Sequence, residues 1–193
     1  YLRWEYTDAP HYFTRVLFTA NPDGSAQMAY YGSNSYWPNA YFYARPIPDH
    51  RTQVIGIVGG HHGVPRAGRL VILDPAKGRF EADGVVQAIP GRGQKIEPVM
   101  VDRLIDGRWP QFLHPYPLSE KYHLVSMKKT PDSLWGVYIV DVFDNLVLLK
   151  ELKGSALLEA VPYRKTTVPP VVAERVDLSR KDATVYISNI YHG

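Results

Sequence analysis

LVILDPAKG, at residues 70–78, decides the fold of this chain: an apolar strand ends at an acidic residue and passes into a tight turn. A continuous run of Leu, Val and Ile favours a short strand buried on both faces, and Asp-Pro with a following Gly favours a turn. The same arrangement occurs at VLFTANPDG (16–24) and VYIVDVFDN (137–145). Three copies of one strand-and-turn unit indicate a repeated β structure.

Two landmarks align the second and third copies. PIP (46–48) corresponds to PYP (115–117), and the aspartate at 74 corresponds to the one at 141. The first proline and the aspartate are 28 residues apart in one copy (46 to 74) and 26 in the other (115 to 141). Segments rich in β-branched and aromatic residues between turns predict the other strands. We expect strands at residues 1–6, 14–20, 26–31, 41–47, 53–58, 69–73, 84–89, 112–116, 122–127, 135–140 and 146–152.

The repeat indicates a particular all-β architecture. Units of roughly 40–50 residues or somewhat more, with about four strands each, are typical of β-propeller blades. We predict a β-propeller segment of roughly two and a half to three blades, within a larger propeller of about six or seven. Residues 1–154 would form the blades. Residues 155–193 would form a proline-containing tail, with strands at 157–162 and 184–191, leading to a following domain.

Composition excludes several classes of protein. The 193 residues carry a net charge of +3 that is dispersed along the chain, so we expect no nucleic-acid partner. No run approaches the roughly 18 apolar residues of a membrane-spanning helix, so we expect no membrane span. The chain has no cysteine, which excludes disulfides, thiolate metal sites and c-type haem attachment within these residues.

Long and unusual motifs resemble a known family, the middle domain of the hydrazine synthase alpha subunit and its relatives. The resemblance covers nearly the whole chain. It lies in RWEYTDAPHYFTRVLFTANPDG (3–24), GSNSYWPNA (32–40), GIVGGHHGVPRAGRLVILDPAKGR (56–79), FLHPYPLSEKYHLVS (112–126), TPDSLWGVYIVDVFDNLVLL (130–149) and RVDLSRKDATVYISNIYHG (175–193).

The resemblance implies a context for the segment. In this family the middle domain is a β-propeller between other domains of large extracytoplasmic proteins, some of which carry haem c. The family's namesake joins nitric oxide and ammonia into hydrazine at haem centres. We therefore expect a segment that is not catalytic by itself, a scaffold for neighbouring domains of the same chain and for other subunits. The parent protein could be a haem-dependent oxidoreductase, with its haem outside these residues.

Two alternatives stay open at this point. The segment could contribute ligands or walls to a haem or metal redox site that neighbouring domains hold. It could instead bind a glycan or peptide at the central mouth of a propeller, because one fold supports many functions.

The paired histidines of GGHHG (59–63) are the sharpest candidates for ligand chemistry. Flanking glycines allow close approach of a ligand, and one of His61 and His62 could bind a metal while the other packs. A metal would need a third ligand, for which His114 and His50 are candidates. The alternative is a histidine pair that hydrogen-bonds to backbone carbonyls.

Two further pairs of residues have assigned roles. Asp74 and Asp141 recur at the same place in the repeat, so we predict that they cap turns by accepting backbone N–H bonds. Tyr191 and His192 lie where the chain would leave the propeller, and each residue type can be an axial haem ligand. The alternative for both is an ordinary strand residue.

Overall fold

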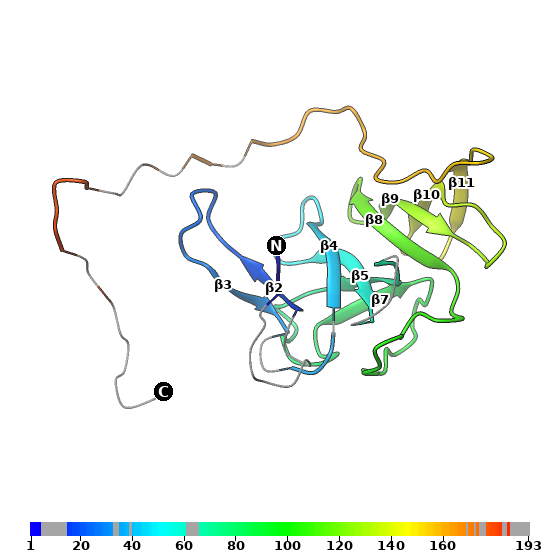
Figure 1. The fold of residues 1–193 in the computed structure, drawn as a ribbon, viewed down its shortest axis with the longest axis horizontal. Helices are drawn as coiled ribbons and strands as arrows, with labels where there is room; N and C mark the ends of the chain where they lie inside the picture. Colours follow the sequence, from blue (N-terminus) through cyan, green and yellow to red (C-terminus); the bar gives the residue numbers. More distant parts are fainter. Residues whose placement is uncertain are drawn as a thin grey trace.

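The computed structural model describes residues 1–4, 15–32, 35–38, 40–60, 66–168, 170–171, 173, 177–182 and 185. These residues form an all-β structure of three antiparallel sheets, and no helix occurs among them (Figure 1). The described part of the chain therefore also contains no helix of the length and hydrophobicity needed to cross a membrane.

Each sheet is a meander in which strands adjacent in the chain pair side by side. The first sheet has three strands, and the second and third have four. The first sheet consists of β1 (Leu2–Trp4), β2 (Arg15–Thr19) and β3 (Met28–Tyr31). The second consists of β4 (Ala40–Pro46), β5 (Val54–Gly59), β6 (Arg69–Leu73) and β7 (Val85–Ile89). The third consists of β8 (Gln111–Pro117), β9 (Tyr122–Lys128), β10 (Gly136–Asp141) and β11 (Leu146–Lys150).

The all-β prediction is confirmed, and each strand predicted up to residue 152 has a counterpart. The strand predicted at 157–162 is wrong. Leu157 donates a backbone hydrogen bond to the Trp135 carbonyl at 2.9 Å, but no ladder follows. Pro162 has no N–H to donate, which opposes a ladder at that end. The strand predicted at 184–191 lies outside the described residues apart from Val185.

Pairing registers correct the alignment of the two prolines. Pro46 pairs with Val54 in the second sheet, and Pro117 pairs with His123 in the third. Val54 and His123 occupy equivalent positions. Val54 pairs with Leu73, just before Asp74, and His123 pairs with Val140, just before Asp141. In the repeat, Pro46 therefore corresponds to Pro117 and not to Pro115. The difference arises because the turn between the first two strands is shorter in the third sheet. There Leu118 N donates to Tyr122 O, whereas in the second sheet Ile47 N donates to Gln53 O.

Alternate residues of the strands in the second sheet point to opposite faces. Both faces are buried, because each packs against a neighbouring sheet. We call the side toward the first sheet the upstream face and the side toward the third sheet the downstream face. The upstream face packs with Leu17 and Tyr31 of the first sheet. Its buried residues are Tyr41, Val54, Val58, Val71, Leu73 and Ala88. The downstream face contributes Ala40, Phe42, Ile55, Ile57, Leu70, Ile72 and Ile89 to the other core cluster.

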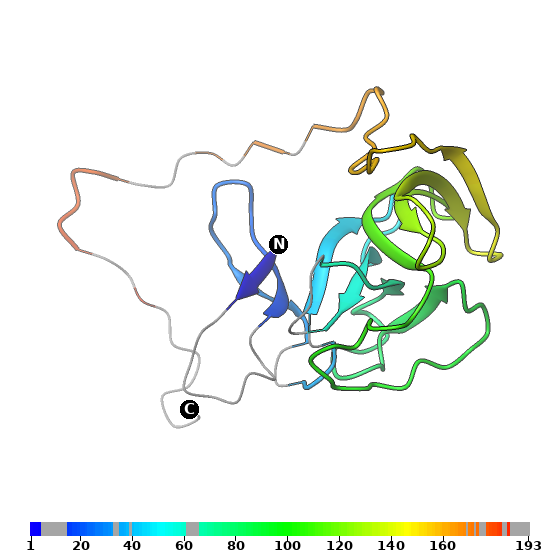
Figure 2. The ribbon, with the colours of Figure 1, turned by 45° about the vertical axis from the view of Figure 1, so that its right-hand side comes forward.

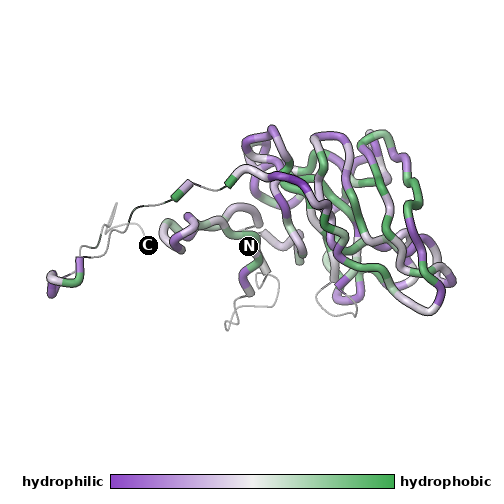
Figure 3. The backbone as a smooth tube through the Cα atoms, turned by 90° about the horizontal axis from the view of Figure 1, so that it is seen from above, coloured by the Kyte–Doolittle hydropathy of each residue, from purple (hydrophilic) through white to green (hydrophobic). Residues whose placement is uncertain are grey.

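The third sheet joins that second cluster through its own upstream face. The residues that it contributes are Phe112, Val125, Met127, Tyr138 and Val140. Figure 2 shows the three sheets following one another across the molecule, from blue through cyan to green and yellow. Hydrophobic stretches run along the strands, and hydrophilic residues gather at the turns (Figure 3). Each contact between sheets thus joins a downstream face to an upstream face.

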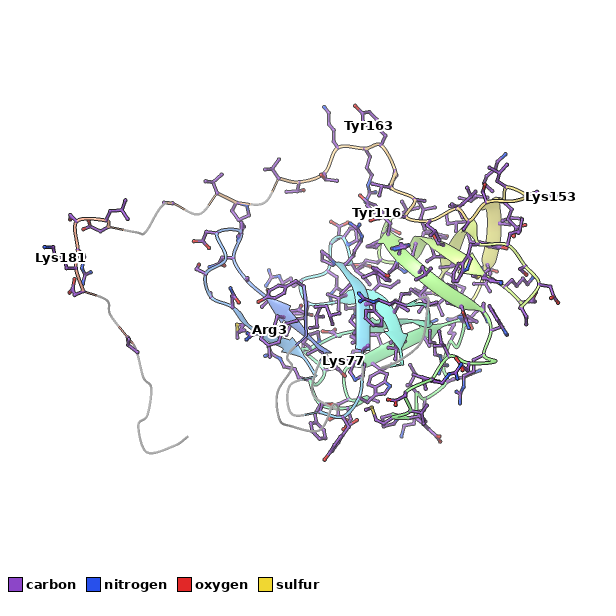
Figure 4. The ribbon with its side chains drawn as sticks, in the orientation of Figure 1. Arg3, Lys77, Tyr116, Lys153, Tyr163 and Lys181 are labelled. Atoms are coloured by element: carbon purple, nitrogen blue, oxygen red, sulfur yellow. The ribbon has the colours of Figure 1, made fainter. Side chains whose placement is uncertain are left out.

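The chain after β11 crosses the downstream face of the third sheet and then leaves it. Glu159 N donates to Ser126 Oγ at 3.1 Å, and Arg164 Nη1 donates to Leu118 O at 3.1 Å. Tyr116, near the end of β8, has the guanidinium groups of both Arg45 and Arg164 over its ring, at 5.1 and 5.6 Å (Figure 4). The described residues further along lie away from the sheets (Figures 1 and 4).

Candidate functional site

A cavity of about 490 Å³ lies at one end of the second sheet. Val58 of β5, Val71 of β6 and the buried Trp37 line it on the sheet side. The irregular connection from β7 to β8 closes the opposite side, with Ile105 and Trp109 among its lining residues. Gln111 and Phe112, at the start of β8, complete the wall toward the third sheet.

Local hydrogen bonds give the β7–β8 connection its shape. Turns close between Gly91 O and Gln94 N and between Ile105 O and Arg108 N, each at 3.1 Å. Gln111, buried at the start of β8, donates from Nε2 to Ile105 O at 3.0 Å. These bonds hold the cavity wall to the sheet without regular secondary structure.

A carboxylate from the third sheet fixes the beginning of the same connection. Asp144, in the turn between β10 and β11, accepts the backbone N–H groups of Gly91 and Arg92 at 3.0 and 2.9 Å. The guanidinium of Arg92 in turn lies 5.1 Å from the centroid of the Phe143 ring. Charge-assisted bonds of this kind are stronger than neutral ones, so Asp144 links the second and third sheets at the edge of the cavity wall.

Two arginines give the cavity its charge. Arg69 begins β6, and Arg108 lies in the β7–β8 connection. Partial burial, followed by the nearby positive charge of Arg108, lowers the pKa of Arg69. Glu97 also lines the cavity, so two positive charges face one negative charge. A concave apolar site with two neighbouring guanidinium groups can bind an anionic group.

The two turn aspartates accept backbone and side-chain hydrogen bonds. Asp74 Oδ1 accepts from Ala76 N at 3.0 Å and from Thr52 Oγ1 at 2.7 Å. Asp141 Oδ1 accepts from Phe143 N at 2.9 Å and from Asn145 N at 3.0 Å. Burial raises the pKa of each carboxyl, but these bonds outweigh it and bring the pKa below its ordinary value. Both geometries are those of a turn cap.

The two histidines considered as third metal ligands lie in unlike settings. His50 Nδ1 accepts the backbone N–H groups of Thr52 and Gln53 in the β4–β5 turn. That turn lies at the opposite end of β5 from Gly60, about 20 Å away for six residues of strand. His114 lies within β8, where its ring contacts Tyr43. Burial is the main reason that the pKa of His114 is lowered.

The remaining sequence candidates lie outside the described residues. They are His61, His62, Tyr191 and His192. Gly60, which precedes the histidine pair, packs so closely against the Asp102 backbone that a Cβ would clash there. Within the described ranges, no three His, Asp or Glu side chains form a group that could hold a metal ion.

Sequence reasoning missed a buried histidine, His123 on β9. Its side chain is fully buried on the upstream face, and neither ring nitrogen has a hydrogen-bond partner among the residues that the structure describes. Burial lowers its pKa to about 4, against the opposing influence of Asp141. The equivalent residue of the second sheet is Val54. Once the registers are aligned, a histidine in a valine position is the signal that identifies it.

The cavity arginines were also missed. Arg69 precedes an apolar strand, and Arg108 lies in a segment with no hydrophobic periodicity. Their approach depends on how the connection folds back over β6, which no local pattern encodes.

Comparisons of the chain with protein-family models, with curated proteins and with solved structures found no match.

Proposed function

We propose that this chain is a β-propeller segment that acts as a scaffold, and that further sheets cover its open faces. The observation that carries the proposal is the polarity of sheet packing. The downstream face of the first sheet meets the upstream face of the second, and the downstream face of the second meets the upstream face of the third. Successive blades of a propeller pack in this repeated manner around an axis.

One row of apolar side chains on the third sheet supports the proposal that another sheet packs there. In the second sheet, Ile55 and Ile72 lie opposite each other on the downstream face, and both are almost fully buried. The equivalent pair in the third sheet is Leu124 and Ile139, and both remain partly exposed. Val147 pairs with Ile139 on β11 and is 52% exposed. The third sheet thus presents the same apolar row without the cover that the second sheet has.

The sequence resemblance supports the biological setting of the proposal. A middle domain similar to that of the hydrazine synthase alpha subunit would lie in a large extracytoplasmic protein and would dock neighbouring domains or subunits. Haem c in such a parent would be attached elsewhere, because these residues lack the cysteines for it. The proposal assigns the segment no catalytic step of its own.

Cysteine labelling tests the cover over the third sheet. The chain has no natural cysteine, so Val147→Cys gives a single reporter on the downstream face. Asp132→Cys, in an exposed turn, is the matched control. In the isolated chain, at a dilution at which it is monomeric, both should react with a maleimide at similar rates. In the intact protein that contains this chain, Val147→Cys should react with the maleimide at least tenfold more slowly than in the isolated chain. The reaction rate of Asp132→Cys should stay the same.

Equal labelling of both sites in the whole polypeptide would overturn the proposal. Sedimentation of the isolated chain gives an independent check. An uncovered apolar face and unpaired edge strands should cause concentration-dependent association. A chain that stays a monodisperse monomer at every concentration would contradict the expectation that further sheets are required.

A further inference from the structure

We propose that the cavity at the end of the second sheet binds a small organic carboxylate, with its anionic group at Arg69 and Arg108 and its apolar body against Trp109 and the neighbouring aliphatic wall. The proposal concerns a ligand site that the scaffold proposal does not require. It would hold whether or not further sheets complete a ring.

The first support is a pair of arginines that outnumbers the negative charge of Glu97 in the same cavity. Neither Arg69 nor Arg108 forms an ion pair with any described residue, although both line one cavity. Their positive charges lie close enough for Arg108 to lower the pKa of Arg69. Two positive charges and the single negative charge of Glu97 leave a positive excess in this concave space, which attracts an anion. The planar guanidinium group matches a carboxylate with two parallel hydrogen bonds.

The second support is the local backbone, which leaves room for the Arg69 side chain. A Cβ on Gly91 would lie 3.3 Å from Arg69 Nη2, and Gly91 has a φ of 144° that other residues rarely adopt. The backbone N–H of Gly91 is held by Asp144 at 3.0 Å. The third sheet therefore fixes the segment past which the Arg69 guanidinium extends.

The third support is the character and size of the remaining wall. Most lining residues are apolar: Trp37, Val58, Val71, Pro90, Ile96, Val99, Leu104, Ile105, Trp109, Pro110 and Phe112. The volume of about 490 Å³ is within the usual range for small-molecule sites. A free phosphate would leave this apolar surface uncovered. A carboxylate with an apolar body would cover it, so the lining favours the carboxylate.

Calorimetric titration with four probes separates the two parts of the site. Phenylacetate and indole-3-acetate carry a carboxylate on an aromatic body, phenylacetamide is the neutral counterpart, and inorganic phosphate lacks the body. We expect at least one of the two carboxylates to bind at micromolar to low millimolar concentration and to change the tryptophan fluorescence, to which Trp37 and Trp109 of the cavity contribute. The amide and the phosphate should bind at least tenfold more weakly.

Charge-removing variants locate the binding. Arg69→Gln and Arg108→Gln keep a polar, unbranched side chain but remove the positive charge, and each should weaken carboxylate binding at least tenfold. Arg180→Gln, on the tail where Arg180 pairs with Asp182, should leave binding unchanged. Circular dichroism melts of each variant confirm folding, and Arg108→Gln provides the test if Arg69→Gln unfolds. Failure of both carboxylates to bind, equal binding of the amide, or unchanged binding in both cavity variants would overturn the proposal.

Discussion

The ring centroids of Tyr43 and His114 lie 4.4 Å apart. The two residues occupy equivalent positions in the first strands of the second and third sheets. Each lies at an irregularity of the first strand of its sheet, between Phe42 and Arg45 or between Leu113 and Tyr116. Both have a left-handed backbone, with φ of 54° and 46°. Equivalent bulges of β4 and β8 therefore meet, which brings the first strands of neighbouring sheets together.

This ring contact should contribute measurable coupling between the sheets. Tyr43→Asn and His114→Asn remove the rings but keep a residue type that tolerates a left-handed backbone. A double-mutant cycle in urea should give a coupling free energy of about 0.5–1.5 kcal/mol, which is typical of a pair of ring side chains in contact. If the two losses in the free energy of unfolding add within about 0.3 kcal/mol, the contact does not stabilise the pair of sheets.

Protonation of His123 should destabilise the fold in mild acid. Its folded pKa of about 4 is below its unfolded value of about 6.5, so the unfolded chain binds more protons between these values. Stability should therefore fall as the pH decreases from about 6.5 to about 4, by on the order of 3 kcal/mol. His114, whose pKa burial also lowers, adds to the same trend. Urea unfolding at stepped pH measures it, and a flat profile in this window would contradict it.

Replacing His123 with the valine of the equivalent position should stabilise the chain. His123→Val removes two buried ring nitrogens that have no partner, and each unsatisfied group costs about 1–3 kcal/mol. The smaller side chain leaves a partial cavity, so we expect a net gain of about 1 kcal/mol at pH 7 and a flatter pH profile. Thermal and urea unfolding of the variant beside the natural chain check both. A destabilised variant would indicate that His123 has a partner.

Gly56 should not tolerate a side chain. A Cβ at this position would lie 2.6 Å from the Tyr41 ring, which is fully buried and hydrogen-bonded through its hydroxyl to Val71 O. Gly56→Ala should reduce the free energy of unfolding by about 1–3 kcal/mol through overpacking. Adding Tyr41→Leu in the same chain makes room, so the double variant should lose less than the sum of the two single losses. Strict additivity would show that the ring moves aside freely.

Asp144 should stabilise the contact between the second and third sheets. Asp144→Asn keeps a residue that tolerates the φ of 70° but replaces one carboxylate oxygen with an N–H₂ group that cannot accept from Gly91 or Arg92. We expect a loss of about 1–2 kcal/mol in the free energy of unfolding. Asp132→Asn, in an exposed turn, is the control and should change stability by less than about 0.5 kcal/mol. Equal effects of the two substitutions would remove this role from Asp144.

Local patterns predicted the strands well because each strand is defined by its own apolar residues and turns. The turns after Leu73 and Val140 begin at Asp74 and Asp141, and the side chains there accept the bonds that turn chemistry requires. The alignment of prolines failed because the length of a turn does not appear in the hydrophobic pattern. Arg69 and Arg108 were missed for a related reason: an irregular segment brings them together, and tertiary contacts determine its course.

The directional order of the faces limits how copies of this chain can associate. In both contacts between sheets, an upstream face packs against a downstream face. Two copies joined through these faces would form a heterologous pair, not a two-fold symmetric dimer, and each pair would leave one free face at either end. Growth would then continue from copy to copy until the rotation closed a ring, or without limit as a filament.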